Sequence, residues 1–330
     1  MTVRRVSTVL VGMGAALVCL SAAFAAERTP QEWLERMNHA FIDTDYDGIF
    51  SYYSGNDLST LRVVHSIRDG VQHERLIHLN GAPREIIRTG NQVEFVLQPG
   101  DEILELENSI PSGPFAQAFT TATSGGNCYT MALHGPDRVA DRDATRLDVL
   151  PRDHDRYGFH LWLDDDTGLL LRSELVDSAG QKLEIFQFAT LKIGDIKDSD
   201  LKPDHEDGAL ISHLTLDAAR QATASPAEWR AGWVPNGFTM ASSDIRRRPS
   251  SSQAVNTLMY TDGLTMFSVF VEAMPETGAA NAVTRSGATV AVSHVVTGGP
   301  DHGHHLVTVV GEIPTATAQR IAQSVVYPGQ

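Results

Sequence analysis

The sequence predicts a mostly β, α+β protein: an open N-terminal half-barrel that carries a helix, followed by a smaller α+β C-terminal domain. Three observations lead to this fold class. An amphipathic helix pattern begins near residue 29, about eleven short β-rich runs follow up to residue 196, and a second β-rich region beyond residue 228 ends in a helix. With 330 residues, the chain is long enough for two hydrophobic cores.

The first 25 residues have the pattern of a secretory signal peptide. Arg4 and Arg5 give a basic start, residues 6–20 are apolar and uncharged, and Ala23-Phe24-Ala25 supplies a cleavage site of small residues. The apolar stretch is shorter than the ~20 residues that a membrane-spanning helix needs. We therefore expect residues 1–25 to be removed and the mature protein to lie in the periplasm.

The mature chain is predicted to start with one helix. Thr29-Pro30-Gln31-Glu32 combines an N-cap, a proline at the first helical position and a glutamate at N3. Trp33, Met37, Ala40 and Phe41 follow at helical spacing, so one face of this helix is expected to be buried.

The region up to residue 196 is predicted to be one large antiparallel sheet. Its β-rich runs are short and separated by turn residues, and a loop rich in Gly, Ser and Thr spans residues 109–127 before a run from Tyr129 to Leu133. Asp166-Thr167-Gly168 and Ser178-Ala179-Gly180 separate the last three runs as hairpins. About eleven such strands favour a curved sheet or open barrel.

The domain boundaries follow from a change of composition. Residues 26–200 are expected to form the first domain, and residues 201–227, which are polar and interrupted by proline, to form a linker. Residues 228–330 are expected to form the second domain. In its closing helix, which Pro314 opens, Ala318, Ile321 and Val325 share one face.

Charge and cysteine content exclude several classes. The formal net charge is −15, so nucleic-acid binding is not expected. Cys19 falls in the signal peptide, and Val18 before it does not favour a lipoprotein cleavage site. Cys128 then remains alone in the mature chain, which excludes an internal disulfide. We expect it as an unpaired thiol in the glycine-rich loop.

Two segments resemble metal sites, but neither is complete. The run from Asp43 to Gly48 has the first half of an EF-hand loop, yet Ser54 stands where the closing glutamate belongs. His304 and His305 lie beside His302, but neighbouring residues of an extended chain point to opposite sides. We therefore expect a helix-to-strand turn and a hairpin tip, and no metal or other cofactor.

No catalytic motif is complete either. The mature chain lacks the G-x-S-x-G, H-E-x-x-H, P-loop and G-x-G-x-x-G patterns. Ser199-Asp200-Leu201-Lys202 matches S-x-x-K, but the S-D-N and K-T-G companions of such a site are missing. We therefore expect a protein that is not an enzyme.

The remaining candidates are binding surfaces in the first domain. Five arginines between residues 62 and 88 form a basic segment that either meets anionic groups or only protects strand edges. The apolar strand faces either line a lipid cavity or form ordinary core. The candidate lipid-binding residues on these faces are Phe50, Tyr52, Leu61, Val63, Leu76, Val93, Phe95 and Leu97.

Several segments together resemble the RseB/MucB family of sigma-E regulators, and they follow one another in the same order over nearly the whole mature chain. They are Leu61-Arg62-Val63-Val64-His65, Asn80 to Arg88, Arg138 to Arg142, Trp162-Leu163-Asp164 with Asp166-Thr167-Gly168, Trp233 to Phe238, Tyr260 to Leu264 with Ser268-Val269, and Val309 to Pro314.

This resemblance implies a first domain similar to the lipoprotein carriers LolA and LolB, in which the concave side of an open barrel accepts acyl chains. It also implies a non-enzymatic regulator that binds the periplasmic segment of a single-span anti-sigma factor, protects it from site-1 proteolysis, and releases it on sensing lipid or lipopolysaccharide. Cys128 and the dense basic run Arg246-Arg247-Arg248 depart from what we expect of this family.

For the anti-sigma contact, the candidate residues are Trp233, Arg246, Arg247 and Arg248 in the second domain. A lipoprotein carrier or lipid chaperone is the alternative within binding proteins, and a periplasmic hydrolase is the alternative among enzymes. The sequence leaves the oligomeric state open, a homo-oligomer included.

Overall fold

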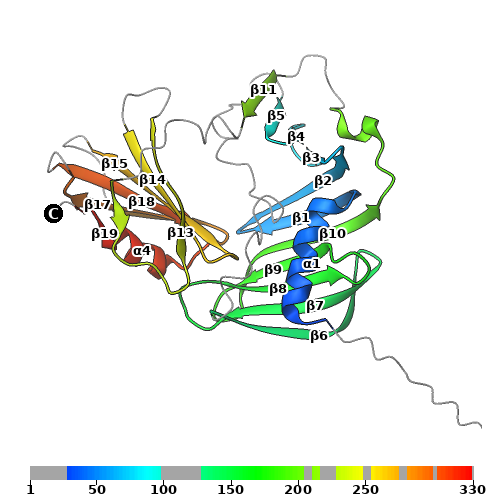
Figure 1. Ribbon diagram of the computed structural model, residues 1–330, viewed down its shortest axis with the longest axis horizontal. Helices are drawn as coiled ribbons and strands as arrows, with labels where there is room; N and C mark the ends of the chain where they lie inside the picture. The colour runs from blue at the N-terminus through cyan, green and yellow to red at the C-terminus, as the bar shows by residue number, and fades with distance from the viewer. Residues whose placement is uncertain are drawn as a thin grey trace, which may run out of the picture.

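The computed structural model describes residues 28–97, 128–203, 210–215, 228–247, 254–274, 281–299 and 303–328. Its described part contains two large antiparallel sheets that lie side by side (Figure 1). The prediction of a mostly β protein with two parts of unequal size is confirmed. No helix among the described residues is long and apolar enough to cross a membrane.

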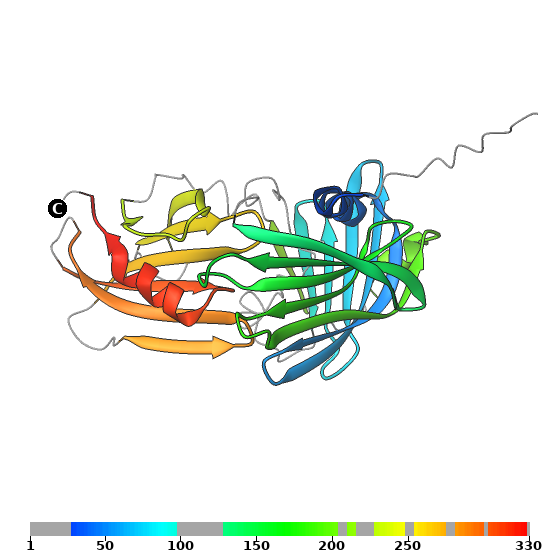
Figure 2. The ribbon, with the colours of Figure 1, turned by 90° about the horizontal axis from the view of Figure 1, so that it is seen from below.

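The first sheet has eleven strands in the described part of the chain, in the order β11-β5-β4-β3-β2-β1-β10-β9-β8-β7-β6. The strands at its two ends run in clearly different directions because the sheet is strongly curved (Figure 2). Since β6 and β11 do not pair, the barrel is open, as predicted. The strands are β1 (Tyr46–Ser54), β2 (Asp57–Arg68), β3 (Val71–His78), β4 (Glu85–Thr89), β5 (Gln92–Leu97), β6 (Tyr129–Val139), β7 (Arg142–Pro151), β8 (Gly158–Asp164), β9 (Leu170–Val176), β10 (Lys182–Ile193) and β11 (Leu210–Thr215).

Helix α1 (Pro30–Asp43) lies across this sheet (Figure 1) and begins where the sequence predicts. The Thr29 side chain accepts a hydrogen bond from the Glu32 amide, and the Glu32 side chain accepts one from the Thr29 amide, which completes the capping box. Its buried face joins the core of the sheet through Trp33, Leu34 and Met37. The outer face of β2 and β3 is covered by the 3-10 helix η1 (Asp198–Leu201).

The second sheet has six strands in the order β13-β14-β15-β18-β17-β16, counted over the described residues. Helix α4 (Thr315–Ser324) packs against β17 and β18 (Figure 2) and buries Ala318 and Ile321, as predicted. The strands of this domain are β12 (Arg230–Ala231), β13 (Thr239–Arg247), β14 (Ala254–Thr261), β15 (Met266–Ala273), β16 (Ala282–Ser286), β17 (Thr289–Thr297), β18 (His304–Gly311) and β19 (Val325–Val326).

Two elements differ from the sequence expectation. Strand β6 continues six residues beyond Leu133, because Gly135-Pro136 forms a bulge on an edge strand and not a turn. The expected linker, residues 201–227, contains β11, which pairs with β5 and extends the first sheet. The expected strand at residues 103–106 and helical turn at residues 217–223 lie outside the described residues.

Candidate functional site

Seven of the eight candidate lipid-binding residues, all except Leu97, share one face of the first sheet. The register of β2 to β5 places Val63, Leu76, Ile86 and Phe95 directly opposite one another in one apolar row. The antiparallel pairing of β1 with β2 places Leu61 opposite Phe50. The sequence pattern therefore identified one real face of the sheet.

Most of this face is packed within the protein. Phe50, Leu61 and Val63 are buried in the same cluster as the helix α1 side chains. Val93 and Phe95 are also buried. Leu76 and Tyr52 are partly buried beside the cluster, and the side chain of Leu97 lies outside the described part of the structure. The alternative of ordinary core therefore describes at least the part of this face beneath α1.

The arginine-rich segment and the acidic turn neutralise each other. Arg62 forms two hydrogen bonds with Asp47, of 2.9 and 2.7 Å, and Arg68 donates to Asp45 at 2.9 Å. Arg75 is buried and bonded to Glu85 at 2.9 Å. Three of the five arginines thus make ion pairs within the sheet and do not form an open anion-binding site. The same pairs occupy carboxylates of the EF-hand-like run, and no group of described residues is placed to hold a metal ion.

His304 and His305 are the first two residues of β18, which pairs with β17. The Gly298 amide donates to the Gly303 carbonyl at 3.0 Å and closes the hairpin of β17 and β18. His305 is buried against Trp229, with 4.8 Å between ring centroids. His302 lies outside the described residues.

Cys128 is an unpaired thiol, as predicted, and it directly precedes β6. Unlike a thiol exposed in a loop, however, it is buried, at the contact between the two domains. Its Sγ is 3.5 Å from the carbonyl oxygen of Asn236, and a Cβ on Gly237 would lie only 2.6 Å from that sulfur. The thiol therefore fills space that belongs to both domains.

The domain junction contains a buried ion pair, which we call the Arg156 contact. Arg156 belongs to the first domain, and its guanidinium bonds to Asp262 in the turn between β14 and β15 and to the Asn236 carbonyl. Tyr129 donates a further hydrogen bond to Asp262 at 2.8 Å. The side chains of Arg156 and Asp262 are both 0% exposed.

The electrostatics of the Arg156 contact favour the charged state. Burial opposes the positive charge of Arg156, but its hydrogen bond to Asp153 and the charge of Asp262 raise the pKa of the guanidinium above its ordinary value. Burial, followed by the charge of Asp262, raises the pKa of Tyr129, so the phenol remains a donor. The guanidinium of Arg156 therefore keeps its charge although its side chain is shielded from water.

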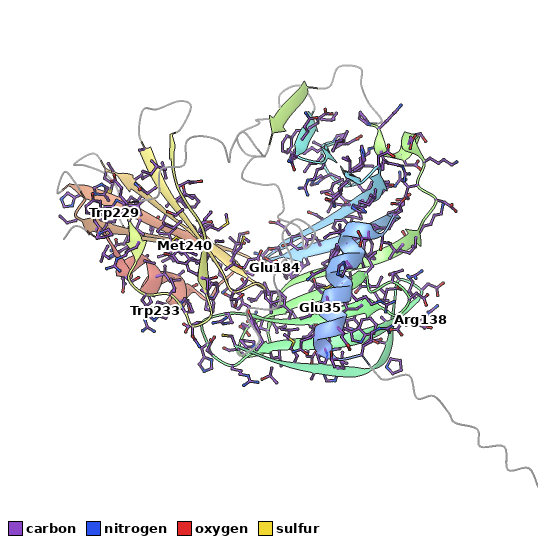
Figure 3. The ribbon with its side chains drawn as sticks, in the orientation of Figure 1. Glu35, Arg138, Glu184, Trp229, Trp233 and Met240 are labelled. Atoms are coloured by element: carbon purple, nitrogen blue, oxygen red, sulfur yellow. The ribbon has the colours of Figure 1, made fainter. Side chains whose placement is uncertain are left out.

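A second polar contact, which we call the Glu184 contact, also joins the domains. Glu184 on β10 accepts hydrogen bonds from Tyr52 at 2.7 Å, from Ser54 at 3.0 Å and from the Ala288 amide of the second domain at 3.1 Å. Figure 3 shows Glu184 where the two sheets meet. Tyr52 thus links the candidate lipid face to the second domain.

The candidate partner-binding residues lie on different elements of the second domain. Trp233 is bound within its own domain: the Arg320 guanidinium lies 3.7 Å from its ring centroid, and its amide donates to Ser324 at 3.0 Å. Arg246 and Arg247 end β13, the edge strand that pairs with β14 alone among the described strands. Their side chains, and all of Arg248, lie outside the described structure.

Sequence reasoning singled out Tyr52 of the Glu184 contact as a candidate lipid-binding residue, but it missed Arg156, Asp262 and Glu184. Asp262 occurs in a segment that carried the family resemblance, but nothing in the sequence paired it with the first domain. The signal that could have found Asp262 is the Asp-Gly turn after β14, where a buried aspartate also caps the Leu264 and Thr265 amides at 2.9 Å.

Comparisons with known proteins cover nearly the whole chain. The family model of the MucB/RseB N-terminal domain matches residues 29–205, and that of the MucB/RseB C-terminal domain matches residues 223–326. The sigma factor AlgU regulatory protein MucB of Pseudomonas aeruginosa is 34% identical over 322 residues, which is 97% of each chain. The sigma-E factor regulatory protein RseB of Haemophilus influenzae is 28% identical over 94% of this chain and 95% of its own.

A solved structure of MucB in complex with MucA(peri) is also similar. It superposes with a TM-score of 0.73 at 34% identity and covers 91% of this chain and 99% of its own. These relatives are named as regulatory proteins, and neither matched family model is that of an enzyme.

Proposed function

Because the chain belongs to the MucB/RseB family, we propose that it is a periplasmic regulator that binds the periplasmic segment of a membrane-bound anti-sigma factor. Bound in this way, the segment is protected from site-1 proteolysis, and lipid or lipopolysaccharide releases it. The single observation that carries this proposal is the full-length similarity to MucB, which has been solved in complex with MucA(peri).

The proposed mechanism needs no catalysis. A binder present at 100 times its dissociation constant stabilises the bound form of its partner by about 2.7 kcal/mol. The free form, which the protease can cleave, is then a small fraction of the total. Lipid that favours the unbound state weakens the affinity for the partner. The partner weakens the affinity for lipid by the same factor. The docked second domain supports a regulator more than a simple lipid carrier, which would need only the first sheet.

The test is a pull-down from envelope extract with the full chain as bait, with and without added lipopolysaccharide. We expect a single-span anti-sigma protein to be captured and to be lost when lipopolysaccharide is added. If lipopolysaccharide does not change the capture, the protein does not sense lipid in this way. If the protein instead transfers a lipoprotein to an acceptor, the alternative function of a lipoprotein carrier is favoured.

We propose that β13 contributes to the partner site. As an edge strand, it is able to accept an added strand, and Arg246 and Arg247 concentrate positive charge at its end in an acidic protein. Arg246→Glu is expected to weaken binding of the anti-sigma segment about tenfold, since one reversed interfacial charge is worth ~1.4 kcal/mol.

The matched control for β13 is Arg138→Glu, the same reversal at an exposed residue of the first domain (Figure 3). Binding is measured by titration of the labelled anti-sigma segment. Equal losses in both variants would indicate a general charge effect and remove β13 from the site.

For lipid, we propose that the apolar row on β2 to β5 contacts acyl chains. Arg88 shares this face, and its buried Nε has no hydrogen-bond partner in the described structure, which favours a ligand with an anionic group. Leu76→Asp is expected to reduce lipid uptake by the delipidated protein about tenfold, because burying a leucine side chain is worth ~1.5–3 kcal/mol.

Ile77→Asp is the control for the lipid face, because Ile77 is the next residue on β3 and points to the opposite face. It is expected to bind lipid like the natural sequence. If delipidated protein takes up no lipid at all, or if both variants lose uptake equally, this face is not the lipid site.

A further inference from the structure

Three hairpin turns from the two domains meet beside the Glu184 contact (Figure 3). The turn between β1 and β2 contains Gly55, and the turn between β16 and β17 contains Gly287. A Cβ on Gly55 would lie only 2.9 Å from the Gly287 amide nitrogen, and a Cβ on Gly287 would lie 2.8 Å from a carboxylate oxygen of Glu184. The third turn, which ends at Gln181, leads into β10. The first two turns therefore touch, and they hold the third beside them.

A pocket of about 280 Å³ opens between these turns. Its lining includes Lys182 at the start of β10 and Arg285 near the end of β16, so each domain contributes one cation. The side-chain amides of Asn56 and Gln181 add neutral donors. Because drug-sized ligands occupy pockets of about 300–1,000 Å³, this pocket suits a small ligand or the headgroup of a larger one.

Arg285 is an exposed cation that the protein does not neutralise. Its Nε donates to the Gly287 carbonyl at 2.8 Å, which holds the guanidinium against the turn of its own hairpin. Burial raises the pKa of Tyr157 in the first domain, and the charge of Arg285 opposes this rise. Arg285 forms no other hydrogen bond and no ion pair within the described part of the chain. Its two terminal nitrogens are therefore available to a ligand.

The acids around the pocket already have partners. Glu174 accepts a hydrogen bond from the half-exposed Lys182 at 2.7 Å, and Arg172 bonds to the same carboxylate oxygen. Glu184 accepts the three hydrogen bonds of the Glu184 contact, and Asp177 accepts two from the amides of its own turn. Since two cations share Glu174, Lys182 retains positive charge that an anionic ligand can meet.

We propose that this pocket binds a phosphate group that bridges Lys182 of the first domain and Arg285 of the second. A phosphate monoester carries a charge of about −1.5 to −2 at neutral pH, which matches two cations. Its three terminal oxygens also accept from neutral donors, as the amides of Asn56 and Gln181 provide. Arginine binds phosphate as a fork and lysine as a point charge. The group comes either from a free phosphate ion or from the headgroup of a lipid.

Bound phosphate is expected to tighten the docking of the two domains. Each domain alone offers only one of the two cations, so the anion favours the docked state. A ligand that binds only this state, at ten times its dissociation constant, raises the docking equilibrium about elevenfold. Tyr53, which also lines the pocket, points away from the face of its neighbour Tyr52. The pocket is therefore separate from the candidate lipid face.

The experiment titrates the free, full-length protein with inorganic phosphate, and chloride at equal ionic strength is the blank. Docking is followed by hydrogen exchange of the Ala288 amide, which is buried and donates to Glu184 at 3.1 Å. Its protection factor is expected to rise about elevenfold when phosphate reaches ten times its dissociation constant. The amide of Val269, in the core of the second domain, is the internal reference and is expected to change little.

A second arm distinguishes a lipid headgroup from free phosphate. It uses phosphatidylcholine vesicles that contain phosphatidic acid, whose headgroup is a phosphate monoester, and pure phosphatidylcholine vesicles are the blank. A response to inorganic phosphate supports a free ion as the ligand, and a response to phosphatidic acid alone supports a lipid headgroup. If neither raises the protection of the Ala288 amide above its blank, the proposal is overturned.

Arg285→Gln and Lys182→Gln are each expected to weaken the response about tenfold, because each removes one charge-assisted hydrogen bond to the phosphate. Lys192→Gln is the matched control, since Lys192 is an exposed lysine of the same strand that does not line the pocket. Full affinity in either pocket variant, or an equal loss in Lys192→Gln, would overturn the proposal. Circular dichroism verifies the fold of each variant, and because no anti-sigma segment is present, the result does not depend on the proposed function.

Discussion

Replacing Arg156 by methionine is expected to lower the free energy of unfolding by about 3–5 kcal/mol, the usual cost of removing one partner of a buried ion pair. The Arg156 guanidinium lies over the rings of Tyr129 and Phe238, and the methionine side chain fills part of this space without a charge. It leaves the Asp262 carboxylate, which is 0% exposed, without its cation. The loss should appear in urea unfolding followed by tryptophan fluorescence, since both domains contain tryptophan.

The double variant Arg156→Met with Asp262→Leu distinguishes an ion pair from simple packing. Removing both charges leaves no uncompensated charge in the junction, so the double variant is expected to be more stable than the sum of the single losses predicts. Purely additive losses would mean that Arg156 acts through its size alone. The Asp262 variant also loses the Tyr129 and turn hydrogen bonds, so recovery is expected to be partial.

Local sequence signals predicted the elements whose stabilising contacts are local. The capping box of α1 joins residues three apart, and both of its hydrogen bonds are present. The hairpin between β8 and β9 depends on the Asp166-Thr167-Gly168 turn, in which Gly168 takes a positive φ of 83°. By contrast, Gly135-Pro136 has the composition of a turn, and only pairing with β7 makes it a bulge.

The junction could not be predicted in this way because its contacts join distant residues. Arg156 and Asp262 are 106 residues apart, and Glu184 and Ala288 are 104 residues apart. An arginine in a charged loop gives the same pattern whether it is solvated or buried. The family resemblance supplied the order of the two domains, but the chemistry that joins them is visible only in three dimensions.

The sequence alone also could not show whether the candidate lipid face is core or a binding surface. Alternation along β1 and β2 correctly placed Phe50 and Leu61 on one face, but a buried core face and a ligand-binding face have the same period of two. What separates them is the position of α1, which covers Phe50 and leaves Leu76 nearer the margin of the cluster. A mutation at Phe50 should therefore report on folding before it reports on ligand.

Phe50→Ala is expected to lower the free energy of unfolding by about 3–5 kcal/mol, because it leaves a cavity in a packed aromatic cluster. The Phe50 side chain is 4% exposed, and its ring centroid lies 4.9 Å from that of Phe186 and 5.9 Å from that of Phe188. Urea unfolding measures the loss. Thermal unfolding should show it as a lowered transition of the first domain.

Tyr53→Ala is the matched control for Phe50, because Tyr53 lies on the same strand, points to the opposite face and is 37% exposed. Its loss is expected to stay below about 1 kcal/mol. The Phe50→Ala variant is expected to take up lipid like the natural sequence at temperatures where it remains folded. The reason is that α1 already occupies this part of the candidate lipid face. A Phe50→Ala protein of unchanged stability that has lost lipid uptake would instead place the acyl chains between α1 and the sheet, with the helix displaced.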